Sequence, residues 1–338
     1  ARVLWNQIVA QAWAVGDPGL IFLDTINQAH TLRSLGWISA TNPCGEVPLL
    51  PFESCNLGSV NLAHMLNVSQ KFGVDWPRLQ STVQTGVRFL DDVLDVNRYL
   101  LPDIARVTLA NRKIGLGVMG WAEMLMALEI PYGSAKAVRL GEEIMRFIRQ
   151  VSLHASHQLA LQRGVFPHWG KSSYFPDHPM RNATVNSIAP TGSISIIAGT
   201  SSSIEPLYGL IFRRHNVLEG EEMIEMDPVF LSRMEALGLW TPKLDRQVRA
   251  HGTLVDTAIS PAIRQVFATS LEIPYDFHLR HQLAFQRYTD NAVSKTINLP
   301  ATATVEDVDH IFHIAWRDGA KGITIYRDGC RQDQTLLQ

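Results

Sequence analysis

Apolar residues recur every three to four positions along several stretches of the chain, and this spacing predicts amphipathic helices. In residues 75–100 the apolar positions that share one face are Leu79, Val83, Val87, Leu90 and Leu94. Asp75 and Pro77 stand where this helix would begin, because an N-cap carboxylate and a first-turn proline both favour a helix start. Comparable patterns predict helices over 1–16, 134–164, 260–274 and 304–319, the last with Thr304 and Asp307 as a capping pair.

Short β-rich stretches separate these helices. They are "TVNSIAP" (184–190), "GLIFRR" (209–214), "AVSKTINLP" (292–300) and "GITIYRD" (322–328). Helices that alternate with strands predict the α/β fold class, but the pattern fixes neither strand order nor strand direction.

Composition and charge exclude several classes of protein. The 338 residues are 46% hydrophobic and 18% charged, with a net charge of -2, so the chain lacks the basic surface that a nucleic-acid polymer requires. The longest apolar run, 114–131, is interrupted by Glu123 and Glu129, which argues against a membrane span. No secretory signal is visible at residue 1, and three cysteines predict a reducing, cytoplasmic location rather than a disulfide scaffold.

Two of the three cysteines lie in "TNPCGEVPLLPFESCNLGSVNLA", residues 41–63. In an extended segment, residues two apart project to one face, roughly 6.5–7 Å from each other. Asn42, Cys44 and Glu46 have that spacing, which would place a thiol between an amide and a carboxylate. The alternative is a turn before a strand, with Cys44 as a small buried side chain. Zinc is disfavoured because no second ligand pair is suitably spaced, and a cysteine hydrolase would need a histidine beside Cys44.

Several segments together resemble the large subunits of ribonucleotide reductases. The matching blocks follow one order along the chain: "ATNPCGE" (40–46), "ESCNLGSVNLA" (53–63), "NRKIGLGVMGWAEML" (111–125), "NSIAPTGSISIIAGTSSSIEP" (186–206), "YTDNAVSKTINLP" (288–300) and "GITIYRDG" (322–329). Ser203 departs from the pattern, because the family usually has glycine there. If that position requires a positive φ, the local loop differs in this chain.

The resemblance implies a fold and a set of catalytic residues. Residues 1–338 would be the C-terminal portion of a ten-stranded α/β barrel with a central catalytic finger loop, without the N-terminal half-barrel and the allosteric region. Cys44 would be the thiyl-radical residue that takes the ribose 3′-hydrogen. Glu46 would accept the 3′-hydroxyl proton, Asn42 would orient the sugar hydroxyls, and Cys55 would be one of two thiols that reduce the 2′ position and end as a disulfide.

A glycine-containing turn is the predicted phosphate site. Backbone amides and hydroxyls in "APTGSIS" could wrap an anion, although a polar turn is the commoner explanation. In the family these positions hold the substrate diphosphate, so the resemblance implies substrate binding by Pro190, Thr191, Gly192, Ser193 and Ile194. The acidic stretch 219–227 reads as a solvated face or loop. His154 and His157 lie one turn apart, but nothing nearby completes a metal site, so no metal ligand is expected.

The source of the radical follows from what the matching segments lack. Gly322 and Ile323 stand where radical-relaying large subunits carry two tyrosines, and Tyr326 is out of register for that role. No glycyl loop follows Cys330. The resemblance therefore implies adenosylcobalamin as cofactor and a vitamin B12-dependent ribonucleoside-diphosphate reductase, with Cys330 as an unrelated free thiol.

The implied partners are a ribonucleoside diphosphate, the N-terminal half of the reductase, a thioredoxin-like or dithiol reductant and, for the complete unit, a second copy in a homodimer. Alternatives are a fragment of a class I large subunit, or a non-catalytic barrel that acts as an interaction partner of an intact reductase. Retention of Asn42, Cys44, Glu46 and Cys55 together favours the enzyme.

Overall fold

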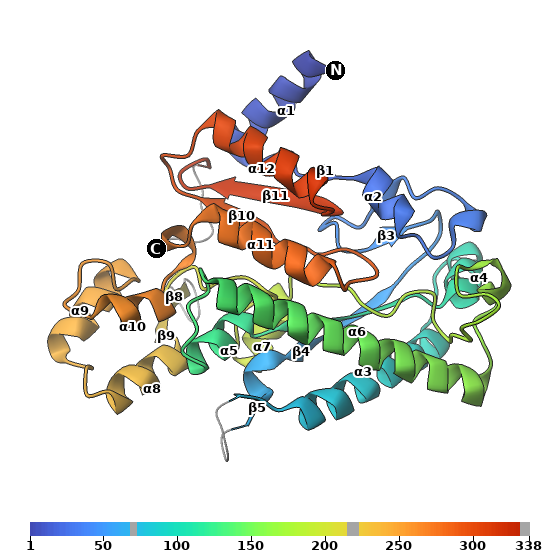
Figure 1. The fold of residues 1–338 in the computed structure, drawn as a ribbon, viewed down its shortest axis with the longest axis horizontal. Helices are drawn as coiled ribbons and strands as arrows, with labels where there is room; N and C mark the ends of the chain where they lie inside the picture. Colours follow the sequence, from blue (N-terminus) through green and yellow to red (C-terminus); the bar gives the residue numbers. More distant parts are fainter. Residues whose placement is uncertain (68–72, 215–222, 332–338) are drawn as a thin grey trace.

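A curved sheet of parallel strands forms the centre of the molecule (Figure 1). The computed structural model describes residues 1–67, 73–214 and 223–331. Strand β4 (Asn56–Asn61) pairs in parallel with β7 (Ile114–Met119), with Asn56 opposite Ile114. The extended segment 184–188 joins the other edge of β7, because Leu116 N donates to Val185 O at 2.8 Å and Leu116 is bridged to Asn186.

The same ladder continues towards the end of the chain. Ile188 is bridged in parallel to Val293, and the chain then runs into β10 (Thr296–Leu299), which pairs in parallel with β11 (Gly322–Arg327). Strand β1 (Leu20–Ile21) pairs with β11 in the antiparallel direction and is the outermost strand on this side. Within the described ranges no strand joins this edge back to β4, so the sheet is an open barrel.

Long helices cover the outside of the sheet. Figure 1 shows α3 (Trp76–Val96) beside α6 (Ala135–Arg163) along β4, and α11 (Tyr275–Gln286) and α12 (Val305–Arg317) beside β10 and β11. The remaining elements are α1 (Arg2–Val15), α2 (Leu23–Gln28), β2 (Ala40–Thr41), β3 (Pro48–Leu49), β5 (Leu66–Asn67), β6 (Gly73–Val74), α4 (Pro102–Asn111), α5 (Trp121–Ala127), α7 (Gly192–Ala198), β8 (Ile211–Arg214), β9 (Met223–Met226), α8 (Pro228–Ala236), α9 (Pro242–His251) and α10 (Pro261–Val266).

Local sequence signals explain where the long helices begin. The Asp75 carboxylate accepts the amide hydrogen of Arg78 at 3.0 Å, and the five apolar positions of α3 are all buried, as predicted. Ser134 caps α6, and Thr304 with Asp307 forms the predicted capping box of α12. The predicted helix at the N-terminus is confirmed as α1.

Two predictions from the sequence are wrong in part. The helix expected over 260–274 stops at Val266, because Thr269 and Glu272 form a second capping box that starts a separate 3-10 turn. The acidic stretch 219–227 is not a loop over its described part, since 223–226 form strand β9, and Asp227 is not solvated, because it is buried as the cap of α8. Residues 219–222 lie outside the described residues.

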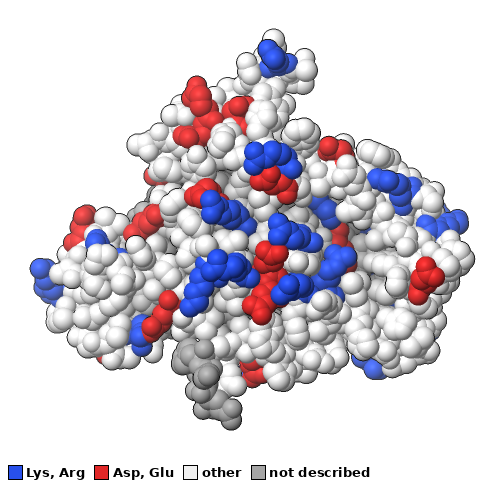
Figure 2. All heavy atoms as spheres, in the orientation of Figure 1, with Lys and Arg blue, Asp and Glu red and all other residues white. Residues whose placement is uncertain are grey.

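Charged side chains of both signs mix on the outer face. In Figure 2 the basic and acidic groups over α6 and α11 alternate, and the structure pairs Arg287 with Glu142 at 2.7 Å across these two helices. This face therefore carries no continuous basic field of the kind that attracts nucleic acid. No helix in the described part of the chain has the length and apolar character needed to cross a membrane.

Candidate active site

The first cysteine lies at the tip of a short hairpin. Strands β2 and β3 pair with Thr41 opposite Pro48, and the residues between them turn tightly. Asn42 closes the turn from both ends, because its carbonyl accepts Gly45 N at 3.1 Å and its side-chain Oδ1 accepts Val47 N at 2.9 Å. Gly45 has φ of +81°, which favours glycine. The extended geometry predicted for 42–46 is therefore wrong, because Gly45 and the Asn42 side chain fold the segment into a turn.

The turn leaves Cys44 exposed and buries Glu46. Partial burial, and then the negative charge of Glu46, raise the pKa of the Cys44 thiol above its ordinary value. Glu46 is 3% exposed, and its Oε2 has no hydrogen-bond partner among the described residues. Its main-chain oxygen is held firmly, because it accepts Ser187 Oγ at 2.8 Å and Ala292 N at 2.9 Å. An exposed thiol thus lies within electrostatic range of Glu46, whose main chain is fixed to two strands of the sheet and whose Oε2 has no partner among the described residues.

The second cysteine lies immediately before β4. Its thiol donates to Asn56 O at 3.5 Å, and burial raises the pKa of Cys55 to about 12. Glu46 acts electrostatically on both the Cys44 and Cys55 thiols, so the carboxylate is a shared neighbour of the two sulfurs. The structure therefore brings Cys44, Glu46 and Cys55 into one region. All three cysteines of the chain are free thiols.

The predicted phosphate turn follows the segment 184–188. Pro190 leads into Thr191, which has φ of +57° and precedes α7, and Gly192, Ser193 and Ile194 form the exposed first turn of that helix. The first amides of a helix have no partner within it and point outward. The turn and the Glu46 loop share a support, because Ser187 holds Glu46 and lies three residues before Pro190. No hydrogen bond among the described residues joins residues 190–194 to Cys44 directly.

Ser203 has a positive φ, the backbone conformation that the glycine usual in the family at this position would favour. Its φ is +50°, in the left-handed region, and its side chain is fully buried with no partner for Oγ among the described residues. The amide of Ser203 donates to Thr191 Oγ1 at 2.7 Å, which fastens the strained residue to the phosphate turn. The position thus requires a positive φ, and this chain adopts it with serine.

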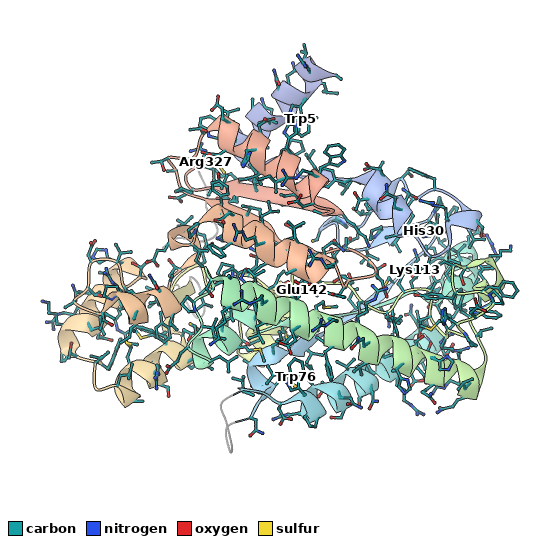
Figure 3. All side chains as sticks on the ribbon, in the orientation of Figure 1. Trp5, His30, Trp76, Lys113, Glu142 and Arg327 are labelled. Atoms are coloured by element: carbon teal, nitrogen blue, oxygen red, sulfur yellow. The ribbon has the colours of Figure 1, made fainter. Side chains whose placement is uncertain are left out.

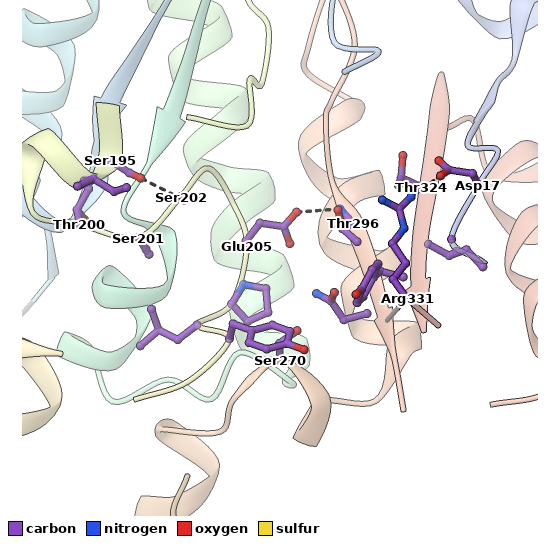
Figure 4. Close-up of a pocket in the computed structure, with 18 residues that line it drawn as sticks. Asp17, Ser195, Thr200, Ser201, Ser202, Glu205, Ser270, Thr296, Thr324 and Arg331 are labelled. Atoms are coloured by element: carbon purple, nitrogen blue, oxygen red, sulfur yellow. Dashed lines mark hydrogen bonds and ion pairs between the residues drawn. The ribbon is translucent and has the colours of Figure 1, made fainter. Parts of the chain in front are cut away.

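A cavity of about 450 Å³ lies between α7, the loop after it, and strands β10 and β11 (Figure 4). Its lining includes Ser202, Glu205, Thr296, Asn298, Thr324 and Tyr326. Glu205 accepts the amide hydrogen of Thr296 at 2.8 Å and forms an ion pair with Lys295. Lys295 is buried and also lies 3.2 Å from His278 Nδ1, so a charged network stands behind the cavity wall.

Sequence reasoning did not single out the buried ion pairs Glu53–Lys113 and Asp91–Arg112, nor the pair of the buried Lys295 with the partly buried Glu205. The available signal was an ionisable residue inside or beside an apolar strand, as in "KIGLGVM" and "VSKTINL". His157 contacts Pro179 O at 2.8 Å, and no cluster of potential metal ligands occurs in the described ranges. Cys330 lies in the turn after β11, as predicted, and Cys44 has no histidine partner among the hydrogen bonds of the described residues.

Comparison with known proteins shows which class of protein this fold and site define. The family model described as "Ribonucleotide reductase, barrel domain" matches residues 1–178 and 174–326. The chain belongs to this family. The class Id ribonucleotide reductase alpha subunit of Actinobacillus ureae has the same fold, with a TM-score of 0.81 over 97% of this chain and 61% of that chain, at 24% sequence identity.

The curated relatives differ in how similar they are to this chain. The chain is 49% identical over 337 residues to the vitamin B12-dependent ribonucleoside-diphosphate reductase of Thermoplasma acidophilum, and 49% identical to that of Mycobacterium tuberculosis H37Rv. It is 29% identical to the ribonucleoside-diphosphate reductase subunit alpha of Chlamydia pneumoniae. The B12-dependent relatives are covered over 44% and 47% of their length, against 99% of this chain, so the chain spans about half of each.

Proposed function

We propose that the chain carries the thiol chemistry of a vitamin B12-dependent ribonucleoside-diphosphate reductase. Family membership and the 49% identity to two enzymes of that name support this proposal. The observation that carries it is the exposed Cys44 thiol within electrostatic range of Glu46, whose buried Oε2 has no hydrogen-bond partner in the described part of the chain. A hydrophobic enclosure of Cys44 would have spoken against a substrate site, and the structure has none there.

Each residue then has one task in the reduction of a ribonucleotide. The Cys44 thiyl takes hydrogen from C3′ of the ribose and becomes a thiol again, and Glu46 accepts the 3′-hydroxyl proton. The 2′-hydroxyl leaves as water with a proton from a thiol. Cys55 and a second thiol supply two electrons and become a disulfide, and Cys44 finally returns a hydrogen atom to C3′. Positioning of these groups around one sugar provides most of the rate enhancement.

Asn42 and the phosphate turn are the proposed binding residues. Asn42 uses its Oδ1 to close the hairpin, so its Nδ2 is the group that would donate to a sugar hydroxyl. The outward amides of Gly192, Ser193 and Ile194, with Pro190 and Thr191 shaping the turn, would hold the diphosphate. Ser187 links the two parts, because it supports the Glu46 loop and lies on the segment that leads into the turn.

The cavity in Figure 4 is the place where the chain could hold part of adenosylcobalamin. Its volume of about 450 Å³ lies in the usual range for small-molecule sites and suits a nucleoside, whereas the corrin ring system would have to lie outside it. Thr296, Asn298 and Thr324 would hold the adenosyl group through their hydroxyl and amide groups. When bound, the cofactor would supply the radical chemistry on which the proposed role of Cys44 depends.

The proposed partners follow from the length of the relatives. Because the chain spans about half of the B12-dependent enzymes, we propose that it acts with the rest of the reductase, which supplies the second thiol, and that the complete unit forms a homodimer. A dithiol protein of the thioredoxin type would reduce the disulfide after each turnover.

The decisive experiment measures reduction of a ribonucleoside diphosphate by the chain together with the rest of the reductase and adenosylcobalamin. We expect turnover with the natural sequence and a loss of at least about a thousandfold with Cys44→Ser, because oxygen cannot take the place of the thiyl. The matched control is Cys330→Ser, which should retain full activity. Equal turnover by the Cys44 variant would exclude its radical role, and no turnover by any form would favour a non-catalytic barrel.

A further inference from the structure

Lys113 is a lysine almost completely removed from water. Only 1% of its side chain is exposed, and Figure 3 labels it in the interior of the molecule near the start of β7. Its Nζ donates to Glu53 Oε2 at 2.7 Å and lies 3.4 Å from Pro48 O. Because an isolated buried ammonium is very unfavourable, the pair with Glu53 is what allows a lysine to occupy this position.

Glu53 connects Lys113 to the segment between the two cysteines. Its Oε2 also accepts Leu50 N at 2.8 Å, and its Oε1 accepts Asn111 Nδ2 at 2.6 Å. Asn111 Oδ1 in turn accepts from His168 Nδ1 at 2.7 Å. Both carboxylate oxygens are therefore bonded, and the ion pair fixes the loop that leads from the hairpin to Cys55.

The pair is also a direct neighbour of Cys55. Asn56 and Ile114 are partners in the parallel ladder of β4 and β7, so the residues immediately before them, Cys55 and Lys113, adjoin at its start. Ser54 fixes the same point from another side, because its amide donates to Thr108 Oγ1 at 3.1 Å. The backbone that carries the thiol is thus held on both sides of Cys55, at Glu53 and Ser54 before it and at Asn56 after it.

The two charges of the pair act on the thiol in opposite directions. Burial is the largest cause of the raised pKa of Cys55, Lys113 lowers that pKa, and Glu53 and then Glu46 raise it. A pair of packed apolar side chains could not accept the hydrogen bonds of Leu50 N and Asn111 Nδ2, and it would place no opposed charges beside the sulfur.

We propose that Glu53 and Lys113 form a positioning pair for Cys55, which fixes the sulfur at the start of β4 and sets its proton affinity through two opposed charges. This inference rests on the proposed function only in giving Cys55 the role of a reductant. A thiol that delivers hydrogen must remain protonated until it reacts, and a lone lysine at this position would favour the thiolate. Glu53 offsets that charge while it holds the loop in place.

The test is the pH-dependent alkylation rate of Cys55 by iodoacetamide in the natively folded protein, followed by peptide mass spectrometry. Glu53→Gln keeps the shape and removes the negative charge, so it should accelerate alkylation at pH 9 by roughly tenfold. Lys113→Met should slow it. The double variant, which removes both charges, should return the rate close to that of the natural sequence, and Glu142→Gln on the surface should leave it unchanged.

A purely structural role gives a different pattern. If the pair only holds the loop, all three variants loosen it, and the alkylation of Cys55 accelerates in each one. That result would overturn the proposal, as would a Glu53→Gln rate equal to that of the natural sequence. If Lys113→Met does not fold, Glu53→Gln and the double variant still distinguish the electrostatic role from the purely structural one. The assay needs no turnover, so its outcome is independent of whether the chain reduces nucleotides.

Discussion

Cys44 and Cys55 lie eleven residues apart in one segment, yet the structure holds the two thiols in opposite ways. Cys44 is exposed at the tip of a hairpin that a single amide side chain, that of Asn42, helps to close. Cys55 is preceded by two residues that are bonded to buried or half-buried partners, and burial raises its pKa to about 12. The Cys44 sulfur is accessible from outside the sheet, whereas the Cys55 sulfur lies within the protein.

This difference matches the different demands of the two proposed roles. A thiol that becomes a radical has to meet both the radical source and the sugar, so it needs an open position with a base beside it. A thiol that delivers hydrogen has to stay protonated and in place. The comparison separates two kinds of support: in our proposal the buried pair of Glu53 and Lys113 serves the second sulfur, while the first depends on the shape of its turn and on the fixed Glu46.

The largest effect that would sharpen this comparison is on stability. Lys113→Met leaves the Glu53 carboxylate buried without its cation, and we expect it to lower the free energy of unfolding by about 3–5 kcal/mol. Urea denaturation would measure this loss. The control is Glu142→Gln, which removes the exposed pair with Arg287 and should cost about 0–1 kcal/mol. A loss of similar size in both variants would show that the ion pair beside Cys55 contributes no more to stability than an exposed pair on the surface.

A smaller effect concerns the environment of Cys44. Glu46→Gln removes the negative charge that, after burial, raises the pKa of the Cys44 thiol. The pKa should therefore fall, the thiolate fraction at pH 8 should rise, and alkylation of Cys44 should accelerate by roughly severalfold. Mass spectrometry of the alkylated peptides would measure this rate, with Cys330 in the same sample as the reference. An unchanged Cys44 rate would mean that Glu46 does not act on the first sulfur.

The sequence predicted the supporting helices well, because their signals are local. The apolar stripe and Asp75 cap of α3 and the Thr304 box of α12 are written within a few turns of chain, and the structure confirms them. The end of the helix that starts at Pro261 was missed, since a second capping box at Thr269 competes with continuation of the helix. Strand order was out of reach, because it depends on contacts between segments far apart in the chain.

The candidate site likewise combines local signals, which the sequence shows, with long-range contacts, which it does not. The motif around Cys44 was visible, but the turn was not, because a single positive φ at Gly45 reverses the chain. The partnership of Glu53 with Lys113 joins residues sixty positions apart, and that of Glu205 with Lys295 joins residues ninety apart. Spacing alone cannot pair such charges. The roles assigned to Asn42, Cys44, Glu46, Cys55 and residues 190–194 remain predictions that the experiments above address.

The smallest predicted effect extends the comparison to the phosphate turn, where the strain lies in the backbone and not in a buried charge. Ser203 has φ of +50°, its Oγ is buried without a partner in the described structure, and its amide hydrogen bond to Thr191 needs no side chain. Ser203→Gly should therefore stabilise the protein by about 1 kcal/mol, because relief of left-handed strain and of the unpaired hydroxyl exceeds the entropy that glycine adds to the unfolded chain. Thermal and urea unfolding would measure the gain.

Ser203→Ala separates the two contributions, since it removes the hydroxyl and keeps the strain, and it should recover only part of the gain. A destabilised glycine variant would show that the Ser203 side chain makes a contact whose contribution exceeds the cost of the backbone strain. The phosphate turn would then be held by side-chain contacts, like the segment before Cys55 and unlike the Cys44 hairpin.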